Sequence, residues 1–294
     1  MTFTITVLAP WVLLAICVAL TPWFERALTP ILFTVAIPGT VAVLCAATAA
    51  SAIAIAAVLL TSGEPWLRLI GLALLATVVW RLLVLMRHAG RVLASRRANA
   101  PFTRAATPGS DVLVIDDPEP DAFAVPTGKG VVVVTAGLCR VLPPDELSAV
   151  IRHERAHLRH RHYAWIQLCE FAARVNPLAD PITRAVRLAA ERHADQAAAR
   201  GGSRPLLRAL ARTSLVRSAR GRAPDSDALH GNGSDVVQRI RALTEQTRPA
   251  TPKRGLAALA VATVAAVVII AGLGDVVEDC VSPEPGEPPS AVFH

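Results

Sequence analysis

Residues 143–165, PPDELSAVIRHERAHLRHRHYAW, crowd four histidines into a segment that has the pattern of a helix. Prolines and acidic residues open it, and both favour a helix N-terminus, where the helix dipole stabilises negative charge. His153 and His157 are four positions apart, a spacing that stacks both imidazoles on one helix face within reach of a single ion. Glu154 lies beside the first histidine and can reach a metal-bound water without being a ligand. The segment therefore predicts a helix that carries two metal ligands and a base.

The arrangement His-Glu-x-x-His is typical of zinc peptidases. In such sites zinc lowers the pKa of its water, and the glutamate takes the proton as that water attacks a peptide carbonyl. The alternative is a solvated basic helix face that has no chemistry. We expect such a face to hold the other basic residues of the segment, which are Arg152, Arg155, Arg159, His160, Arg161 and His162.

A catalytic zinc ion usually has three protein ligands and one open position, so two histidines are not enough. The segment AAERHADQAAAR, residues 189–200, offers Glu191 as the third ligand, on a second helix that can pack antiparallel to the first. Asp195 lies one turn further on and can accept a hydrogen bond from a liganding imidazole, which would fix its tautomer. His193 is a rival third ligand, although it points to another side of the helix.

The chain of 294 residues is unusually apolar, with 53% hydrophobic residues and a mean hydropathy of +0.44. Segments nearly free of charge lie at about 7–20, 31–60, 66–84 and 254–274. Each approaches or exceeds the ~20 residues that a helix needs to cross a bilayer. A cleaved signal peptide is the alternative for the first segment, but no basic region precedes it. We expect a mainly α membrane protein with four transmembrane helices, three of them within residues 1–87.

Basic residues cluster at both ends of the region between the third and fourth apolar segments. They are Arg87, Arg91, Arg96, Arg97 and Arg104 on one side and Arg239, Arg241, Arg248, Lys253 and Arg254 on the other. Because Lys and Arg in short flanking loops stay on the cytoplasmic side, residues 88–253 are predicted to form a cytoplasmic domain. The acidic, proline-rich residues 275–294 are expected to be a short, disordered external tail. These flanks explain the net charge of +7, so no nucleic-acid partner is predicted.

The middle region has the pattern of a small α+β domain. DVLVID, FAVP and GKGVVVVTAGL predict short strands because runs of β-branched residues bounded by glycine suit a sheet. Helices are expected at about 164–175, 179–200, 204–219 and 235–246, in addition to the histidine-rich one. The five cysteines show no paired spacing, so neither a disulfide framework nor a cysteine zinc site is predicted.

Three segments in order, AFAVPTGKGVVVVTAGL, PPDELSAVIRHERAHLRHRH and ERHAD, resemble the BlaR/MecR-type membrane metallopeptidases and, more distantly, the HtpX and CAAX-prenyl-protease group. The likeness covers about residues 110–245 and implies a gluzincin-like zinc peptidase domain. It implies His153, His157 and Glu191 as zinc ligands, Glu154 as general base and Asp195 as the partner of a ligand. LHGNGSDVVQRIRAL resembles a late His-Pro…Arg-Ile segment of the HtpX-like group, but its proline is missing. His230 is therefore either a residue near the oxyanion or a simple loop histidine.

The expected function is an integral membrane zinc metalloendopeptidase of the bacterial inner (plasma) membrane. Its cofactor is Zn²⁺, and its partners are the lipid bilayer and a protein or peptide substrate that adds a strand to a sheet edge near residues 123–135. The family likeness implies a cytoplasmic transcriptional repressor as the substrate. The alternatives are a membrane-protein quality-control protease and a catalytically inactive signalling scaffold. A large external sensor domain is not expected after the last apolar segment.

Overall fold

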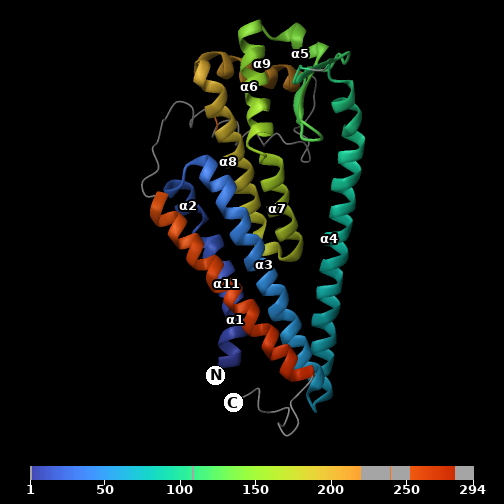
Figure 1. Cartoon of the computed structure of the whole chain (residues 1–294), viewed down its shortest axis with the longest axis vertical. Coiled ribbons are helices and arrows are strands. Elements are labelled where there is room, and N and C mark those ends of the chain that lie inside the picture. Colours follow the sequence, from blue (N-terminus) through green and yellow to red (C-terminus); the bar gives the residue numbers. More distant parts are fainter. Residues whose placement is uncertain (1, 108, 220–238, 240–251, 282–294) are drawn as a thin grey trace. The chain divides into compact units, whose positions relative to one another are not determined.

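The computed structural model describes residues 2–107, 109–219, 239 and 252–281, which are mostly helical with one small sheet (Figure 1). The long helices with apolar stretches are α1 (Thr2–Ala19), α3 (Pro30–Thr61), α4 (Pro65–Ala105) and α11 (Pro252–Val281), and the short helix α2 (Thr21–Ala27) follows α1. The sheet has the strands β1 (Val112–Ile115), β2 (Ala122–Val125) and β3 (Val131–Thr135). The remaining elements are α5 (Ala136–Val141), α6 (Pro144–Arg159), α7 (His162–Val175), η1 (Pro177–Ala179), α8 (Asp180–Ala198), η2 (Ala199–Gly201) and α9 (Ser203–Ala219).

Among the described residues, α3, α4 and α11 are long and apolar enough to cross a membrane. The first expected span is instead a bent pair, Thr4–Ala19 and Thr21–Ala27, whose halves meet at 55°. The part of the chain that the structure describes therefore has three candidate spans, or four if the bent pair counts as one. Helix α11 continues to Val281, so the prediction that disorder begins at residue 275 is wrong for its first residues.

The chain forms two compact units. Unit 1 comprises Met1–Arg91, Ile166–Val186 and Pro249–His294, and unit 2 comprises Val92–Trp165 and Arg187–Arg248. This division differs from a single domain over residues 88–253, because residues 166–186 group with the apolar helices. Two polar contacts join this segment to those helices: the Asn176 amide donates to Thr48 of α3 at 3.1 Å, and His88 of α4 lies 3.4 Å from Glu170.

Polar contacts join the apolar helices of unit 1. The hydroxyls of Thr40 on α3 and Thr263 on α11 are 2.9 Å apart, and Figure 1 shows these two helices side by side. Further along α3, the Trp11 indole of α1 donates to the Ser51 hydroxyl, which in turn donates to the Val7 carbonyl of α1. Hydroxyls buried among apolar side chains need such partners, because an unsatisfied polar group is costly where water is excluded.

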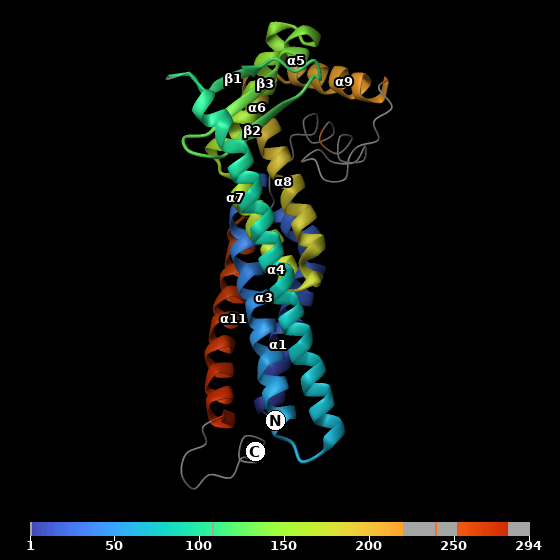
Figure 2. The same ribbon diagram turned by 90° about the vertical axis from the view of Figure 1, so that its right-hand side faces the viewer.

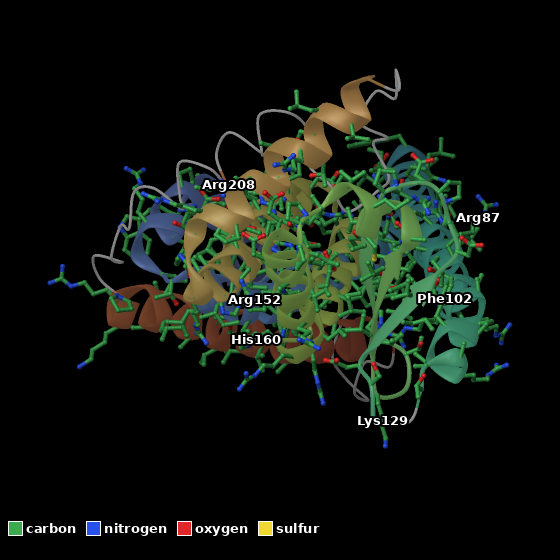
Figure 3. The ribbon with its side chains drawn as sticks, turned by 90° about the horizontal axis from the view of Figure 1, so that it is seen from above. Arg87, Phe102, Lys129, Arg152, His160 and Arg208 are labelled. Carbon is green, nitrogen blue, oxygen red and sulfur yellow. The ribbon has the colours of Figure 1, made fainter. Side chains whose placement is uncertain are left out.

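The sheet of unit 2 has the strand order β1-β3-β2, with β3 parallel to β1 and antiparallel to β2. The hairpin between β2 and β3 contains Gly128 and Gly130 at φ of 59° and 79°, a conformation that glycine adopts without strain. All residues of β3 are buried, which explains its unbroken run of valines. Helix α6 packs on β2 and β3 (Figure 2), and Phe102, labelled in Figure 3, contacts the Phe123 ring of β2. Among the described residues, β2 has no neighbouring strand on the side away from β3, so it is an edge strand of the sheet.

Candidate metal centre

Two helices of unit 2 carry the candidate site. Helix α6 brings His153, Glu154 and His157, and the part of α8 that belongs to this unit brings Glu191 and Asp195. Arg152 donates to the carbonyl of Ala198 at the end of α8 (3.2 Å). The carboxylate of Glu146, only 2% exposed, is paired with Arg212 of α9 at 2.9 Å. These contacts fix α6 against its neighbours and so set the position of both histidines.

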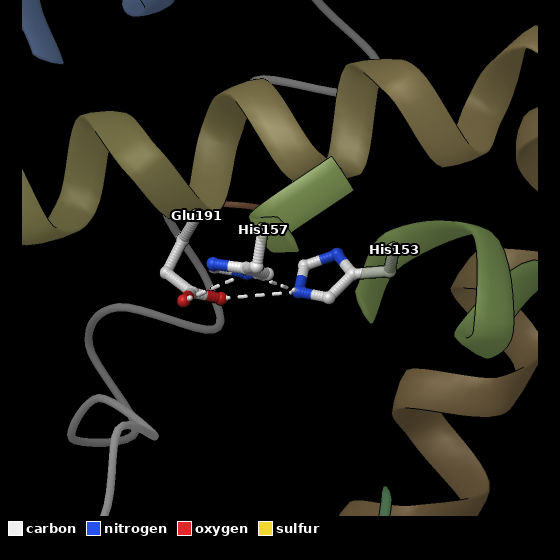
Figure 4. A group of neighbouring side chains, drawn as sticks. All are labelled: His153, His157 and Glu191. Atoms are coloured by element: carbon white, nitrogen blue, oxygen red, sulfur yellow. Dashed lines mark hydrogen bonds and ion pairs between the residues drawn. The ribbon is translucent and has the colours of Figure 1, made fainter. Parts of the chain in front are cut away.

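The side chains of His153, His157 and Glu191 point toward one another (Figure 4). The two Nε2 atoms are 3.1 Å apart, and each lies 3.4 Å from an oxygen of the Glu191 carboxylate. One ligand atom from each residue lies within 4.8 Å of the others. For zinc bonds of about 2.0–2.1 Å, two ligand atoms of a regular tetrahedron lie ~3.3–3.4 Å apart. The three residues therefore have the spacing of one face of a tetrahedral zinc site.

Asp195 and Arg239 support the three ligand residues through hydrogen bonds and ion pairs. The Asp195 carboxylate, only 1% exposed, lies 3.0 Å from Nδ1 of His153, so that it orients the ring whose Nε2 faces the other ligand atoms. Arg239 donates to both Asp195 oxygens at 2.7 Å and lies 3.1 Å from Glu191. One guanidinium thus positions both carboxylates that serve the centre.

The charges of the site favour a cation where the ligand atoms meet. Burial disfavours charge on His153, but hydrogen bonds and charges of Asp195 and Glu191 outweigh it and raise the pKa of His153 to about 10. Burial would also raise the pKa of Glu191, yet His157, His153 and Arg239 hold that pKa well below its usual range. Two ionised carboxylates therefore draw positive charge to this point, as a site for a divalent ion requires.

Glu154 lies beside the ligand group without belonging to it. Its side chain is buried at 9% exposure, and burial, followed by the nearby Glu191 and Asp121 carboxylates, raises the pKa of Glu154 to about 7. A backbone hydrogen bond with Ala124 works in the opposite direction and places the carboxylate next to β2. A carboxylate whose pKa is close to neutral is suited to accept and return a proton.

Two of the sequence-based expectations for histidines turn out differently in the structure. His162 was expected on a solvated face, but this prediction is wrong because its side chain is fully buried (0% exposed). His193 was a rival third ligand, but its Nδ1 lies 3.0 Å from Nε2 of His162, and the described ligand group contains Glu191 instead. His230 and the helix expected at 235–246 lie outside the described residues, except for Arg239.

Sequence reasoning missed the roles of Arg239 and His162. Arg239 was expected among the basic residues that flank the last apolar segment, whereas the structure buries it to 6% exposure. Helical periodicity does not separate Arg239 from its basic neighbours, and the signal that could have found it is the Arg-Ile pair of the late segment LHGNGSDVVQRIRAL. The bundle of histidines at 153, 157, 160 and 162 could have pointed to His162, since four imidazoles in ten residues exceed what two ligand positions need.

Comparisons with known proteins point to the same part of the chain. Residues 86–169 match the family model described as Peptidase family M48. The chain is 47% identical over 62 residues to a Protease HtpX homolog of Thermodesulfovibrio yellowstonii, covering 20% of this chain and 21% of the relative. It is 49% identical over 50 residues to the homolog of Thermoplasma acidophilum (17% and 16%) and 34% identical over 90 residues to that of Methanocaldococcus jannaschii (27% and 31%). The chain spans less than a third of the length of these relatives. No solved structure gives a significant match.

Over part of its length the chain is therefore similar to peptidases of family M48, and its described residues include helices long and apolar enough to cross a membrane. The BlaR/MecR-type likeness stays a prediction. The matched range includes His153, Glu154 and His157, whereas Glu191 and Asp195 lie beyond it. Their place in the site therefore depends on the geometry described above.

Proposed function

We propose that this protein is a membrane-bound zinc metalloendopeptidase with its site in unit 2. The observation that carries the proposal is the convergence of three ligand atoms, at separations of 3.1–3.4 Å, beside a buried glutamate that is not one of them. A closed structural zinc site has four protein ligands, while a catalytic site keeps one position open. Three ligands with an adjacent carboxylate suit the second kind, which argues against an inactive scaffold.

His153, His157 and Glu191 would hold the ion, and Asp195 would keep His153 in the tautomer that leaves Nε2 free. A bound zinc ion supplies Lewis acidity, which lowers the pKa of a water molecule. Glu154 would take the proton of that water at its carboxylate and give it to the leaving amine. Its pKa of about 7 fits both the uptake and the return of a proton near neutral pH.

The substrate would bind in an extended form along β2. In an antiparallel pair, every second residue of an edge strand turns its backbone N–H and C=O away from its partner strand, where another chain can pair with them. The hydrogen bond between Ala124 and Glu154 places the middle of β2 next to the proposed base. A peptide on this edge would therefore lie with a backbone carbonyl close to the carboxylate.

Glu154→Gln tests the enzymatic role. Glutamine keeps the size of the side chain and removes its basicity, so we expect proteolysis to fall by a factor of about a hundred or more while zinc content is unchanged. Cleavage of an unfolded protein substrate and self-cleavage would be followed with the full-length chain in detergent, and bound zinc measured by atomic emission. Glu64→Gln, a change in the exposed loop after α3, is the matched control. Equal cleavage by Glu154→Gln and the wild type would remove Glu154 from the mechanism.

We propose regulatory proteolysis, such as cleavage of a cytoplasmic transcriptional repressor, as the biological role, and membrane-protein quality control as the alternative. The similarity to proteins named Protease HtpX homolog is compatible with the alternative. The Glu154→Gln variant can separate the two roles, because a protease that binds its substrates without cleaving them can be purified together with them. Recovery of one small cytoplasmic protein with this variant supports regulation, whereas recovery of many unrelated membrane proteins supports quality control.

A further inference from the structure

The turn between α6 and α7 brings a third imidazole against the metal centre. Helix α6 ends at Arg159, and α7 begins only three residues later at His162. Arg161 adopts a φ of 52°, the left-handed conformation that residues other than glycine rarely take. This reversal buries the His162 side chain completely and places its Nδ1 3.2 Å from Nδ1 of His157.

His162 in turn contacts α8. Its Nε2 lies 3.0 Å from Nδ1 of His193, a residue that is only 7% exposed. His157, His162 and His193 thus form a chain of three imidazoles joined by two nitrogen–nitrogen contacts. On the far side of the ligand group, His153 has the Asp195 carboxylate as its partner. The two histidine ligands are therefore supported by different chemical groups.

The chain of imidazoles has one consistent assignment of protons. If Nε2 of His157 offers its lone pair to an ion, the proton of that ring is on Nδ1, which donates to His162. The proton of His162 is then on Nε2, which donates to Nδ1 of His193. Each ring is neutral with one proton, and each nitrogen in the two contacts has a defined role as donor or acceptor.

We propose that His162 is a positioning residue of the metal centre, which fixes the orientation and tautomer of His157 and is itself fixed by His193. The inference rests on the proposed function to the extent that His157 is a metal ligand. It gives His193 the role of support for the site. Because the partner of His157 is a neutral imidazole, this side of the centre adds no negative charge, in contrast to the Asp195 side.

The surroundings agree with three neutral imidazole rings. His162 and His193 are only 0% and 7% exposed, and burial disfavours a charged imidazole. A histidine that only filled space could be exchanged for an apolar side chain of similar volume. Here both ring nitrogens of a fully buried imidazole meet other imidazoles of the same site, which a space-filling role does not require.

Zinc affinity of the purified full-length chain in detergent, measured by competition with a chromophoric chelator, tests this role. In His162→Leu we expect zinc binding to weaken about 10- to 100-fold, the usual effect of removing the partner of a liganding histidine. In His162→Asn the amide oxygen takes the place of Nδ1 and can still accept from His157, so affinity should stay within a factor of about three of wild type. His193→Leu should weaken binding less than His162→Leu.

The visible spectrum of the Co²⁺-loaded protein provides a second readout, because it reports ligand geometry and not folding. We expect a changed spectrum for His162→Leu and a wild-type spectrum for His162→Asn. His88→Leu is the matched control, since it removes another buried imidazole whose partner is Glu170, and zinc affinity should not change. If His162→Leu does not fold, the zinc affinities of His162→Asn, His193→Leu and the wild type still test the predicted order.

Two results would overturn the inference. One is wild-type zinc affinity and an unchanged Co²⁺ spectrum in His162→Leu. The other is equal loss of affinity in His162→Asn and His162→Leu, since the proposed acceptor would then have no role. His157→Leu separates this inference from the proposed function. If it binds zinc as wild type does, the ligand assignment fails, whereas loss of zinc in His157→Leu alone leaves the proposed function and rejects only the role of His162.

Discussion

At the scale of single residues, burial distinguishes two ion pairs that have nearly the same geometry. Arg155 donates to both oxygens of Asp111 at 2.6 Å, and Arg239 donates to both oxygens of Asp195 at 2.7 Å. The first pair is about half exposed on both sides, with side-chain exposures of 47% and 52%. The second pair is 8% and 1% exposed. Water can replace the partner in the first pair and cannot in the second.

We therefore expect Arg239→Met to destabilise the protein strongly and Arg155→Met to have little effect. Removing Arg239 leaves the buried Asp195 carboxylate without its cation, which costs about 3–5 kcal/mol. Loss of an exposed pair costs only about 0–1 kcal/mol. Denaturant unfolding of the two variants and the wild type in the same detergent measures the difference. Equal destabilisation by both changes would show that burial does not govern these pairs.

Residue by residue, the sequence predicts what helical spacing alone determines. His153, Glu154 and His157 follow from one helix, and Glu191 and Asp195 follow from a second helix once the first is identified. The partners of these residues could not be predicted in the same way. The position of His162 depends on a left-handed backbone at Arg161, and Arg239 reaches Asp195 across 44 positions of sequence. Neither contact leaves a periodic signal in the chain.

At the scale of elements, the start of α5 lies very close to the loop that connects β1 and β2. The N–H of Gly137 donates to the carbonyl of Asp117 at 2.8 Å. A Cβ atom at Gly137 would lie 2.2 Å from the carbonyl oxygen of Pro118, which belongs to the backbone and cannot rotate away. The connection between β1 and β2 thus requires a residue without a side chain at this position.

Gly137→Ala should lower the free energy of unfolding by about 1–3 kcal/mol, because the loop must move to admit the methyl group. Gly90→Ala on α4 is the matched control. A Cβ at Gly90 meets nothing within 4 Å, so that alanine should leave stability unchanged or raise it by about 0.5–1 kcal/mol through its higher helix propensity. Thermal unfolding followed by circular dichroism tests both. A neutral Gly137→Ala would mean that the loop yields without cost.

The strands show which features of an element the sequence determines. The run VVVVT predicts a buried strand and forms β3, because two neighbours and the helical layer cover it. The strand order could not be predicted from the sequence alone, since β1 pairs with β3 in parallel while β2 lies on the other side of β3. Helix α7 was predicted at almost its observed length, but the grouping of residues 166–186 with the apolar helices was not. That grouping involves contacts between residues far apart in sequence, such as Asn176 with Thr48, which leave no local pattern.

At the scale of the whole molecule, the placement of basic residues predicts how the chain crosses the membrane. Arg96, Arg97 and Arg104 follow the most apolar part of α4, and Lys and Arg are retained on the cytoplasmic side. A reporter fused after Arg97 should therefore be cytoplasmic. Fusions after Gly63 and after Glu284 should both be external, because α4 and α11 each provide one crossing. An external reporter after Arg97 would reject this orientation and, with it, a cytoplasmic substrate.

The edge strand β2 has only four residues, Ala122–Val125. A peptide that pairs with so short a strand gains few backbone hydrogen bonds, and each net bond contributes only about 0.5–1.5 kcal/mol. Such pairing would also read little of the amino-acid sequence, since backbone groups are the same in every peptide. Under the proposed peptidase function, selection among substrates would then depend on how often a peptide chain meets the site. Confinement to one membrane raises the local concentration of neighbouring proteins around the site. The location of a substrate would then contribute more to its selection than its amino-acid sequence.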